Sequence, residues 1–170
     1  HTALTRECRR RRGVTVPTTI EQLRVAVAAN PVHPRPQGEL AKRLFAAGDY
    51  PAALEAAMRA AELGYGAYGE MPVLAAKAAM RSGDPESGAA LLLLALDLRY
   101  RDIESLRQDP DFAPLSEVPQ VADALGIMDD ELDRTEGWLF DINFFDRELR
   151  RRAPTPFAIV TPEELDVRLR

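Results

Sequence analysis

The sequence predicts an all-α fold built from antiparallel helix pairs, and three observations lead to this prediction. Apolar residues recur at helical spacing, as in the row Ile20, Leu23 and Val27. Proline and glycine stand between such rows, where they end helices and form tight turns. A pattern of small residues is repeated after 35 residues. No alternation of apolar and polar residues predicts a strand, apart from one short edge strand at most in residues 156–162.

The first helix is expected to begin after Thr19 and to end at Asn30. Thr19 is followed three residues later by Gln22, which is the spacing of a capping box. Asn30 precedes a proline, and a residue in that place avoids the helical conformation because the proline ring would clash with it. Residues 31–38 contain several prolines, so we expect a connector that is neither a helix nor a central strand.

Two pairs of helices joined by short turns are expected next. The second helix of each pair begins with proline, which the first turn tolerates because an N–H group there would have no partner. Gly64 follows the first pair, where glycine readily takes the left-handed conformation that caps a helix. The expected helices cover residues 38–47, 51–63, 72–81 and 85–98, with turns at residues 48–50 and 82–84.

A short helix and a longer helix are expected after these pairs. A turn-rich stretch leads to Ser116, which is expected to cap a short helix that ends at Gly126. The longer helix is expected to begin near Glu131 or Glu136 and to end at Arg152, which precedes a proline by two residues.

The two ends of the sequence predict a piece of a longer protein. The last helix is expected to begin with a capping box of Thr161 and Glu164, with Pro162 in its first turn, and its pattern continues to residue 170. The sequence begins with His1 instead of methionine, and its first residues do not have the pattern of a signal peptide.

The repeated pattern of small residues indicates a close approach of helices. Self-similarity at a period of this size is typical of helical solenoids. Small residues at the contact between two helices let them approach to about 8 Å, so the alanines are expected to set this spacing. The matching residues are Ala41 with Ala76, Lys42 with Lys77, Gly48 with Gly83, Asp49 with Asp84, Ala53 with Gly88, Ala57 with Leu92 and Ala60 with Ala95.

Residues 38–64 resemble a tetratricopeptide repeat, and the residues on the pattern of that family are Leu40, Ala41, Leu44, Gly48, Tyr50, Ala53, Ala57 and Ala60. The second unit departs from the pattern, because Pro85 replaces the aromatic residue of the turn and Gly88 replaces an alanine. Residues 98–126 are similar to a segment that closes such arrays. The resemblance implies a short solenoid over residues 19–126 that binds a protein or a peptide.

In the register of that family, eight positions face a groove: Glu39, Lys42, Phe45, Ala46, Leu74, Lys77, Met80 and Arg81. Five of them, Lys42, Phe45, Lys77, Met80 and Arg81, are expected to bind an extended peptide with acidic groups or a C-terminal carboxylate. The alternative is that the lysines are only solvated and that Phe45 and Met80 belong partly to the core.

The C-terminal segment, residues 127–170, carries an apolar stripe of Trp138, Ile142, Phe145 and Leu149 at helical spacing. We expect this helix to dock on a neighbouring domain of the same chain, or else to form oligomers. The segment also resembles the leading part of C-terminal-processing serine peptidases, through Trp138, Asp141, Phe145, Glu148, Leu149, Pro154, Pro156, Phe157, Glu164 and Leu165. The resemblance includes no catalytic motif, and it implies a peptidase domain beyond residue 170.

Charge and composition exclude several classes of function. The net charge of −5 gives no general attraction to nucleic acid or to anionic lipid. The basic segment 1–18 is expected to be a solvated run because it lacks the aromatic residues that base stacking requires. No apolar run reaches the roughly 18 residues of a membrane-spanning helix. We expect no nucleic-acid or membrane partner, and a soluble protein for which the cytoplasm is favoured over export.

No arrangement of residues predicts a catalytic site, a metal site or a cofactor. Cys8 is the single cysteine, which excludes an internal disulfide, and no histidine near it is placed to act as its base. His1 and His33 lack the spacing of zinc ligands. The acidic residues 129–133 lack the glycine and the distal glutamate of a calcium loop, so we expect a solvated helix start.

Overall fold

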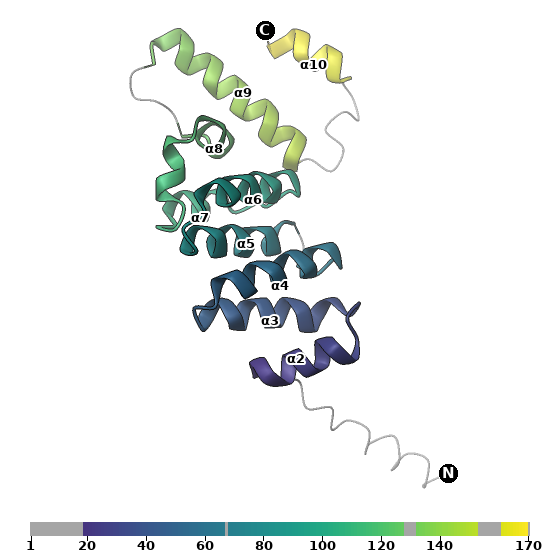
Figure 1. Ribbon diagram of the computed structural model, residues 1–170. Helices are drawn as coiled ribbons and strands as arrows, with labels where there is room; N and C mark the ends of the chain where they lie inside the picture. Colours follow the sequence, from purple (N-terminus) through teal and green to yellow (C-terminus); the bar gives the residue numbers. More distant parts are fainter. Residues whose placement is uncertain (1–18, 67, 128–131, 153–160, 170) are drawn as a thin grey trace, which may run out of the picture.

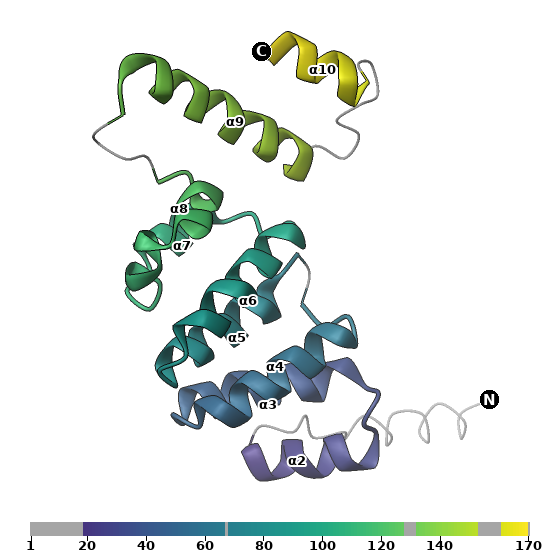
Figure 2. The same ribbon diagram turned by 45° about the horizontal axis from the view of Figure 1, so that its top comes forward.

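The computed structural model describes residues 19–66, 68–127, 132–152 and 161–169. Every regular element in these residues is a helix, which confirms the predicted all-α class. Figures 1 and 2 show the helices following one another from α2 at one end to α9 and α10 at the other. The elements are α2 (Ile20–Ala29), α3 (Pro34–Ala46), α4 (Tyr50–Glu62), α5 (Glu70–Arg81), α6 (Pro85–Asp97), α7 (Ile103–Gln108), the 3-10 helix η1 (Ala113–Glu117), α8 (Pro119–Leu125), α9 (Arg134–Arg152) and α10 (Pro162–Leu169).

The two helix pairs, α3 with α4 and α5 with α6, have the same turn at equivalent positions. Gly48 and Gly83 have φ angles of +82° and +80°, which glycine adopts without a steric penalty, so the chain reverses within three residues. Asp49 and Asp84 then cap α4 and α6. Each carboxylate accepts a hydrogen bond from the backbone N–H three residues later, at 3.4 and 3.0 Å.

The equivalence continues to the end of each pair, where the sequence pattern is less obvious. Gly64 has a φ angle of +77°, and its counterpart 35 residues later is Arg99, with a φ angle of +67°. The next residues, Tyr65 and Tyr100, donate backbone hydrogen bonds to the carbonyl oxygens five residues earlier, at 2.8 and 3.0 Å. The two pairs therefore end in the same left-handed cap, although one of them has arginine where glycine is usual.

Small side chains fill the contacts between the helices, as the sequence predicts. The side chains of Ala41, Ala53, Ala57, Ala76 and Ala95 are fully buried. The core consists of two clusters, one centred on α2 to α5 and the other on α5 to α8. Larger apolar side chains enter the second cluster, whose buried members are Ala76, Leu92, Leu96, Ile103, Leu106, Phe112, Leu115, Val121 and Leu125.

The prediction that residues 31–38 form a connector is wrong for residues 34–38, because α3 already begins at Pro34. Pro34 and Pro36 lie in the first turn of the helix, where backbone N–H groups have no carbonyl partner within the helix. The two prolines therefore remove no hydrogen bond, and their restricted φ angle suits the helical conformation. His33 precedes the helix, and its side chain makes no capping hydrogen bond.

The predicted cap at Ser116 is also wrong. Ser116 lies inside η1, and its hydroxyl donates a hydrogen bond to the backbone oxygen of Ala113 at 2.7 Å. α8 begins at Pro119, after Val118, whose apolar side chain cannot cap the helix by a hydrogen bond. The end of α8 at Gly126 is confirmed, and Gly126 has a φ angle of +66°.

The other predicted helix ends are close to those observed. The capping box of Thr19 and Gln22 is confirmed, with hydrogen bonds of 3.2 and 3.3 Å in the two directions. The capping box of Thr161 and Glu164 is confirmed in the same way, at 3.0 and 3.2 Å. The observed α9 agrees with the expected longer helix, whereas α4 and α5 begin one and two residues earlier than expected.

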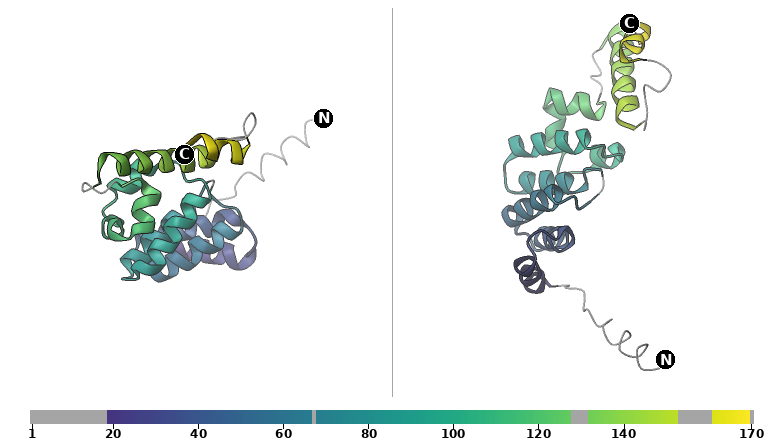
Figure 3. Two further views of the ribbon diagram at one scale, coloured as in Figure 1. Left: turned by 90° about the horizontal axis from the view of Figure 1, so that it is seen from above. Right: turned by 90° about the vertical axis from the view of Figure 1, so that its right-hand side faces the viewer.

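α9 lies across the last part of the stack beside α8, and α10 lies beyond α9, away from α8 (Figures 1 and 3). Gly126 makes room for α9, because a Cβ atom there would lie 2.4 Å from a ring carbon of Phe144. The Phe144 ring has the guanidinium groups of Arg107 and Arg147 near it, at 5.8 and 5.6 Å from its centroid. Arg107 also donates hydrogen bonds to the backbone oxygens of Leu125 and Gly126, at 2.6 and 3.1 Å.

Three expectations concern residues outside the described ranges. They are the solvated basic segment 1–18, which contains His1 and Cys8, the acidic residues 129–131, and the greater part of the edge strand at residues 156–162. Asp133, which follows the acidic run, does start α9, where its carboxylate accepts hydrogen bonds from the backbone N–H groups of Thr135 and Glu136 at 2.7 and 2.9 Å.

Candidate functional site

Most of the residues predicted to bind a peptide lie together on one surface. Lys42 and Phe45 lie about one turn apart on α3, and Lys77 and Arg81 lie about one turn apart on α5. The Nζ atom of Lys77 is 6.0 Å from the centroid of the Phe45 ring, so the two sets are contiguous. We call this surface the α3/α5 face, and it consists of Glu39, Lys42, Phe45, Tyr65, Lys77, Arg81, Asp109 and Asp111.

Tyr65 covers the α3 part of this face. Its ring lies against the backbone of Gly38, where a Cβ atom would be only 1.9 Å from a ring carbon, so any side chain at position 38 would displace the ring. The hydroxyl of Tyr65 donates a hydrogen bond to Glu39 Oε1 at 2.5 Å. Lys42 Nζ donates to the Tyr65 oxygen at 3.3 Å and lies 5.2 Å from the ring centroid. Tyr65 thus joins two charged residues of α3 to the loop after α4.

The hydrogen bonds around Tyr65 change the pKa of each group. The hydrogen bond from Tyr65, assisted by the positive charge of Lys42, lowers the pKa of Glu39 below its usual value. The same hydrogen bond to Glu39, together with burial, raises the pKa of Tyr65. Burial opposes the charged form of Lys42, but its hydrogen bond with Tyr65 and the charge of Glu39 raise the pKa of Lys42. Glu39 and Lys42 are therefore both charged at neutral pH.

Phe45 and Met80, the two apolar members of the predicted site, have different surroundings. Phe45 is half-buried and contacts the Tyr50 ring edge to face, with a distance of 5.4 Å between the centroids. Met80 is half-buried as well. It packs against the second core cluster, as Phe45 packs against the first, and it lies against Gly88, where a Cβ atom would be 2.5 Å from its sulfur. Both side chains thus belong partly to the core, and Phe45 in addition has its ring near Lys77 on the face.

The cations on α5 are bound by carboxylates of the same chain. Lys77 Nζ lies 2.7 Å from Asp109 Oδ2, and Arg81 Nε lies 2.5 Å from Asp111 Oδ1. Asp111 also lies 3.9 Å from Lys77, and its side chain is only 9% exposed. With the pair of Lys42 and Glu39 at 3.5 Å, each predicted cation has an acidic partner. The α3/α5 face is therefore close to electrically neutral, which the sequence pattern alone does not predict.

A hollow of about 540 Å³ lies beside the ion pairs of α5. Lys77 and Arg81 line it on one side, and residues of α7 and of the loop after α7 line it on the other, among them Asp109 and Asp111. A ligand in this hollow would reach the cations and their carboxylate partners at the same time. The chemistry that it offers is ion pairing and hydrogen bonding, and Asp102 and Glu104 add two more carboxylates to its lining.

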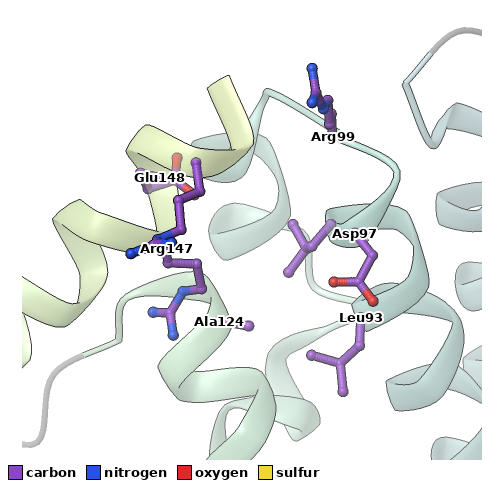
Figure 4. Close-up of a pocket in the computed structure, with 8 residues that line it drawn as sticks. Leu93, Asp97, Arg99, Ala124, Arg147 and Glu148 are labelled. Carbon is purple, nitrogen blue, oxygen red and sulfur yellow. The ribbon is translucent and has the colours of Figure 1, made fainter. Parts of the chain in front are cut away.

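A second cleft, of about 360 Å³, lies where α6 and α8 meet α9. Figure 4 shows Leu93 and Asp97 of α6 on one side and Arg147 and Glu148 of α9 on the other, whereas Arg99 extends away from them. Arg147 is bound to Asp123 through its Nη1 atom at 2.5 Å. The cleft is thus lined by both signs of charge and by leucine, and it exists because α9 lies across α8.

The four residues of the predicted docking stripe do not face the two helix pairs, α3 with α4 and α5 with α6. Trp138 and Phe145 are 62% and 56% exposed, and Ile142 and Leu149 are half-buried. The helix instead contacts α7 and α8 through Phe144 and Arg147. Phe144 was not predicted to make this contact, because it stands outside the regular stripe.

The described residues contain no group of histidine, cysteine and carboxylate side chains that could hold a metal ion. Within the same ranges, no helix combines the length and the apolar character that crossing a membrane requires. Comparison with family models, with curated proteins and with solved structures gives no match for this chain. The resemblances to tetratricopeptide repeats and to peptidase leading segments therefore stay predictions.

Proposed function

We propose that residues 19–126 form a tetratricopeptide-like repeat module whose α3/α5 face binds an extended peptide with carboxylate groups. The observation that carries the proposal is the position of Lys42 and Lys77, which are one repeat apart and belong to the same face, with Lys77 next to the Phe45 ring. The shared turns and left-handed caps of the two helix pairs support the repeat. In arrays of this type, the first helix of each pair lines the binding surface.

The carboxylates of Asp109 and Asp111 support this choice of ligand. They are two residues apart, and they reach Lys77 and Arg81 in the way that acidic residues of a partner would. Because the cations already have partners, a peptide must compete with these two aspartates. Binding is therefore expected to displace the two carboxylates, and their presence is expected to weaken the affinity.

The proposal is tested with fluorescein-labelled hexaglutamate, whose binding is followed by fluorescence anisotropy. Lys42→Glu combined with Lys77→Glu is expected to abolish binding. Asp109→Asn combined with Asp111→Asn is expected to bind about three- to fivefold more tightly, the effect of removing two competing ion pairs whose cations are partly exposed. Arg24→Glu combined with Arg59→Glu is the matched control, because it changes the net charge by the same amount and both arginines lie outside the α3/α5 face, Arg24 on α2 and Arg59 on α4.

Circular dichroism shows whether each variant keeps its helices. Equal weakening by the double arginine variant and by the double lysine variant would mean that only the overall charge matters, and it would overturn the proposed face. If neither the wild type nor the double asparagine variant binds the peptide at millimolar concentration, the proposed ligand class is wrong. If the wild type binds but the asparagine variant is no tighter, the competition is wrong and the face is retained.

A further inference from the structure

α9 carries an apolar patch that faces away from the repeat pairs. Trp138, Leu139 and Phe145 are 62%, 53% and 56% exposed, and Ile142 lies between them along the helix. We call these four residues the α9 patch. Arg147 follows Trp138 by nine residues, which at about 100° per residue places it on the opposite side of the helix, where it binds Asp123.

Exposed apolar surface of this kind is typical of an interaction site when the residues are contiguous. Trp138 and Phe145 are seven residues apart, so they lie on the same side of α9 at a distance of about 10 Å along its axis. Trp138, Ile142 and Phe145 follow one another at intervals of four and three residues, and rows at these intervals form the ridges by which one helix packs against another. The shape of the α9 patch therefore favours a helical partner.

The border of the α9 patch indicates the charge of that partner. A hollow of about 270 Å³ beside Trp138 is lined by Asp133 and Asp141, with Arg134 as its one cation among the described residues. Asp141 has no ion-pair partner in the part of the chain that the structure describes. An indole ring next to two carboxylates suits the side chain of a lysine or an arginine, through a cation–π contact and an ion pair.

We propose that the α9 patch binds an amphipathic helix of a partner protein, in which lysine or arginine borders the apolar stripe. The basic residue would enter the hollow beside Trp138, while the apolar stripe covers Trp138 and Phe145. This proposal is independent of the peptide proposed for the α3/α5 face.

A second copy that packs through its own α9 is a poorer occupant, because none of the arginines of α9 whose side chains the structure describes reaches Asp141 without leaving an ion pair. In an antiparallel pair of α9 helices centred on Ile142, Arg134 of one copy lies about 13 Å along the axis from Asp141 of the other, and in a parallel pair about 10 Å. Among the arginines of α9 whose side chains the structure describes, Arg147 and Arg150 come nearer in the antiparallel pair, and both are already in ion pairs at 2.5 and 2.8 Å. Charge complementarity therefore favours a basic partner over a dimer formed by two α9 helices.

Trp138 is the single tryptophan, so its fluorescence reports on the α9 patch directly. The chain is titrated with three synthetic helical peptides: one with a leucine stripe bordered by lysine, one with the same stripe bordered by glutamate, and one with the lysine composition in scrambled order. The lysine-bordered peptide is expected to shift the emission of Trp138 to shorter wavelength and to bind at least tenfold more tightly than the other two.

Variants locate the binding on the patch. Asp141→Lys is expected to reverse the preference, so that the glutamate-bordered peptide binds more tightly. Phe145→Ser is expected to abolish the shift, and Val25→Ser is its matched control because Val25 is 62% exposed on α2. Lys42→Glu with Lys77→Glu is expected to leave this binding unchanged, which separates the result from the α3/α5 face.

Four outcomes would overturn the proposal. Equal binding of the scrambled peptide would leave only net charge as the cause. Equal binding of the lysine-bordered and glutamate-bordered peptides would contradict the role of Asp141. No shift with any peptide would exclude a helical ligand, because every peptide that covers the patch contacts Trp138. Dimers in light scattering, with an emission shift that depends on protein concentration, would make a second copy the occupant.

Discussion

Replacing Gly38 by alanine is expected to change stability in opposite directions, depending on what stands at position 65. In the native chain the new methyl group would lie 1.9 Å from a ring carbon of Tyr65, well inside contact distance, so the ring must leave its place on α3. When Tyr65 is itself replaced by alanine, the space beside Gly38 is empty. The substitution then changes only the backbone preference of the helix.

The expected magnitudes follow from these two situations. Alanine in a helix interior is favoured over glycine by about 1 kcal/mol, so Gly38→Ala should stabilise the Tyr65→Ala variant by roughly that amount. In the native chain the same gain is opposed by overpacking, which costs about 1–3 kcal/mol and here includes the loss of the hydrogen bond between Tyr65 and Glu39. The two substitutions should therefore be coupled by about 1–3 kcal/mol, with no net gain in the native chain.

Urea unfolding followed by circular dichroism at 222 nm measures the free energy of unfolding for the four proteins of this double-mutant cycle. The Tyr65→Ala variant serves as the reference for helix preference, because its two versions differ only at position 38. A coupling below about 0.5 kcal/mol would refute the reasoning, since independent sites are additive to that extent. The close approach of Tyr65 to Gly38 would then not exist in solution.

Two further predictions concern pH and the core. Because the pKa of Glu39 is lowered, Glu39 stabilises the fold above pH 4.5, its usual pKa, and this stability is lost as the pH falls through the lowered pKa. Because the pKa of Tyr65 is raised, Tyr65 stabilises the fold below pH 10.0, its usual pKa, and this stability is lost as the pH rises through the raised pKa. Tyr65→Phe should therefore flatten both limbs of a plot of unfolding free energy against pH, and two unchanged limbs would contradict this. Leu92→Ala should lower the free energy of unfolding in urea by about 2–5 kcal/mol, and Ala57→Leu should lower it by about 1–3 kcal/mol, because both equivalent positions are fully buried. Native stability of the variant with both substitutions would contradict this prediction and would show that the two units are interchangeable.

Local signals explain why most helix ends were predictable from the sequence. A capping box such as that of Thr19 and Gln22 acts within one helical turn, so its residues are close together in any fold that contains the helix. The start of α3 was missed for a related reason. Proline breaks a helix when it stands in the interior, but the first turn accepts it. The sequence alone does not show whether the helix lies before or after Pro34.

The binding face was predictable only in part, because its charges are balanced by residues distant in sequence. Lys42 and Lys77 were identified from their spacing of one repeat. Asp109 follows Lys77 by 32 residues and Tyr65 follows Glu39 by 26, and no local pattern links either pair. One signal was present: Gly38 stands inside a helix, where glycine is unfavourable unless something lies close to the backbone.

Arg107 makes the end of α8 and the position of α9 depend on one another. Its guanidinium group holds the carbonyl oxygens at the end of α8 and lies near the ring of Phe144 on α9. Opening of α9 would therefore weaken the protection of α8 against hydrogen exchange, and fraying of α8 would loosen α9. The closing helices are therefore expected to open as one cooperative unit, in which an event at the outer surface of the chain changes the lifetime of hydrogen bonds closer to its core.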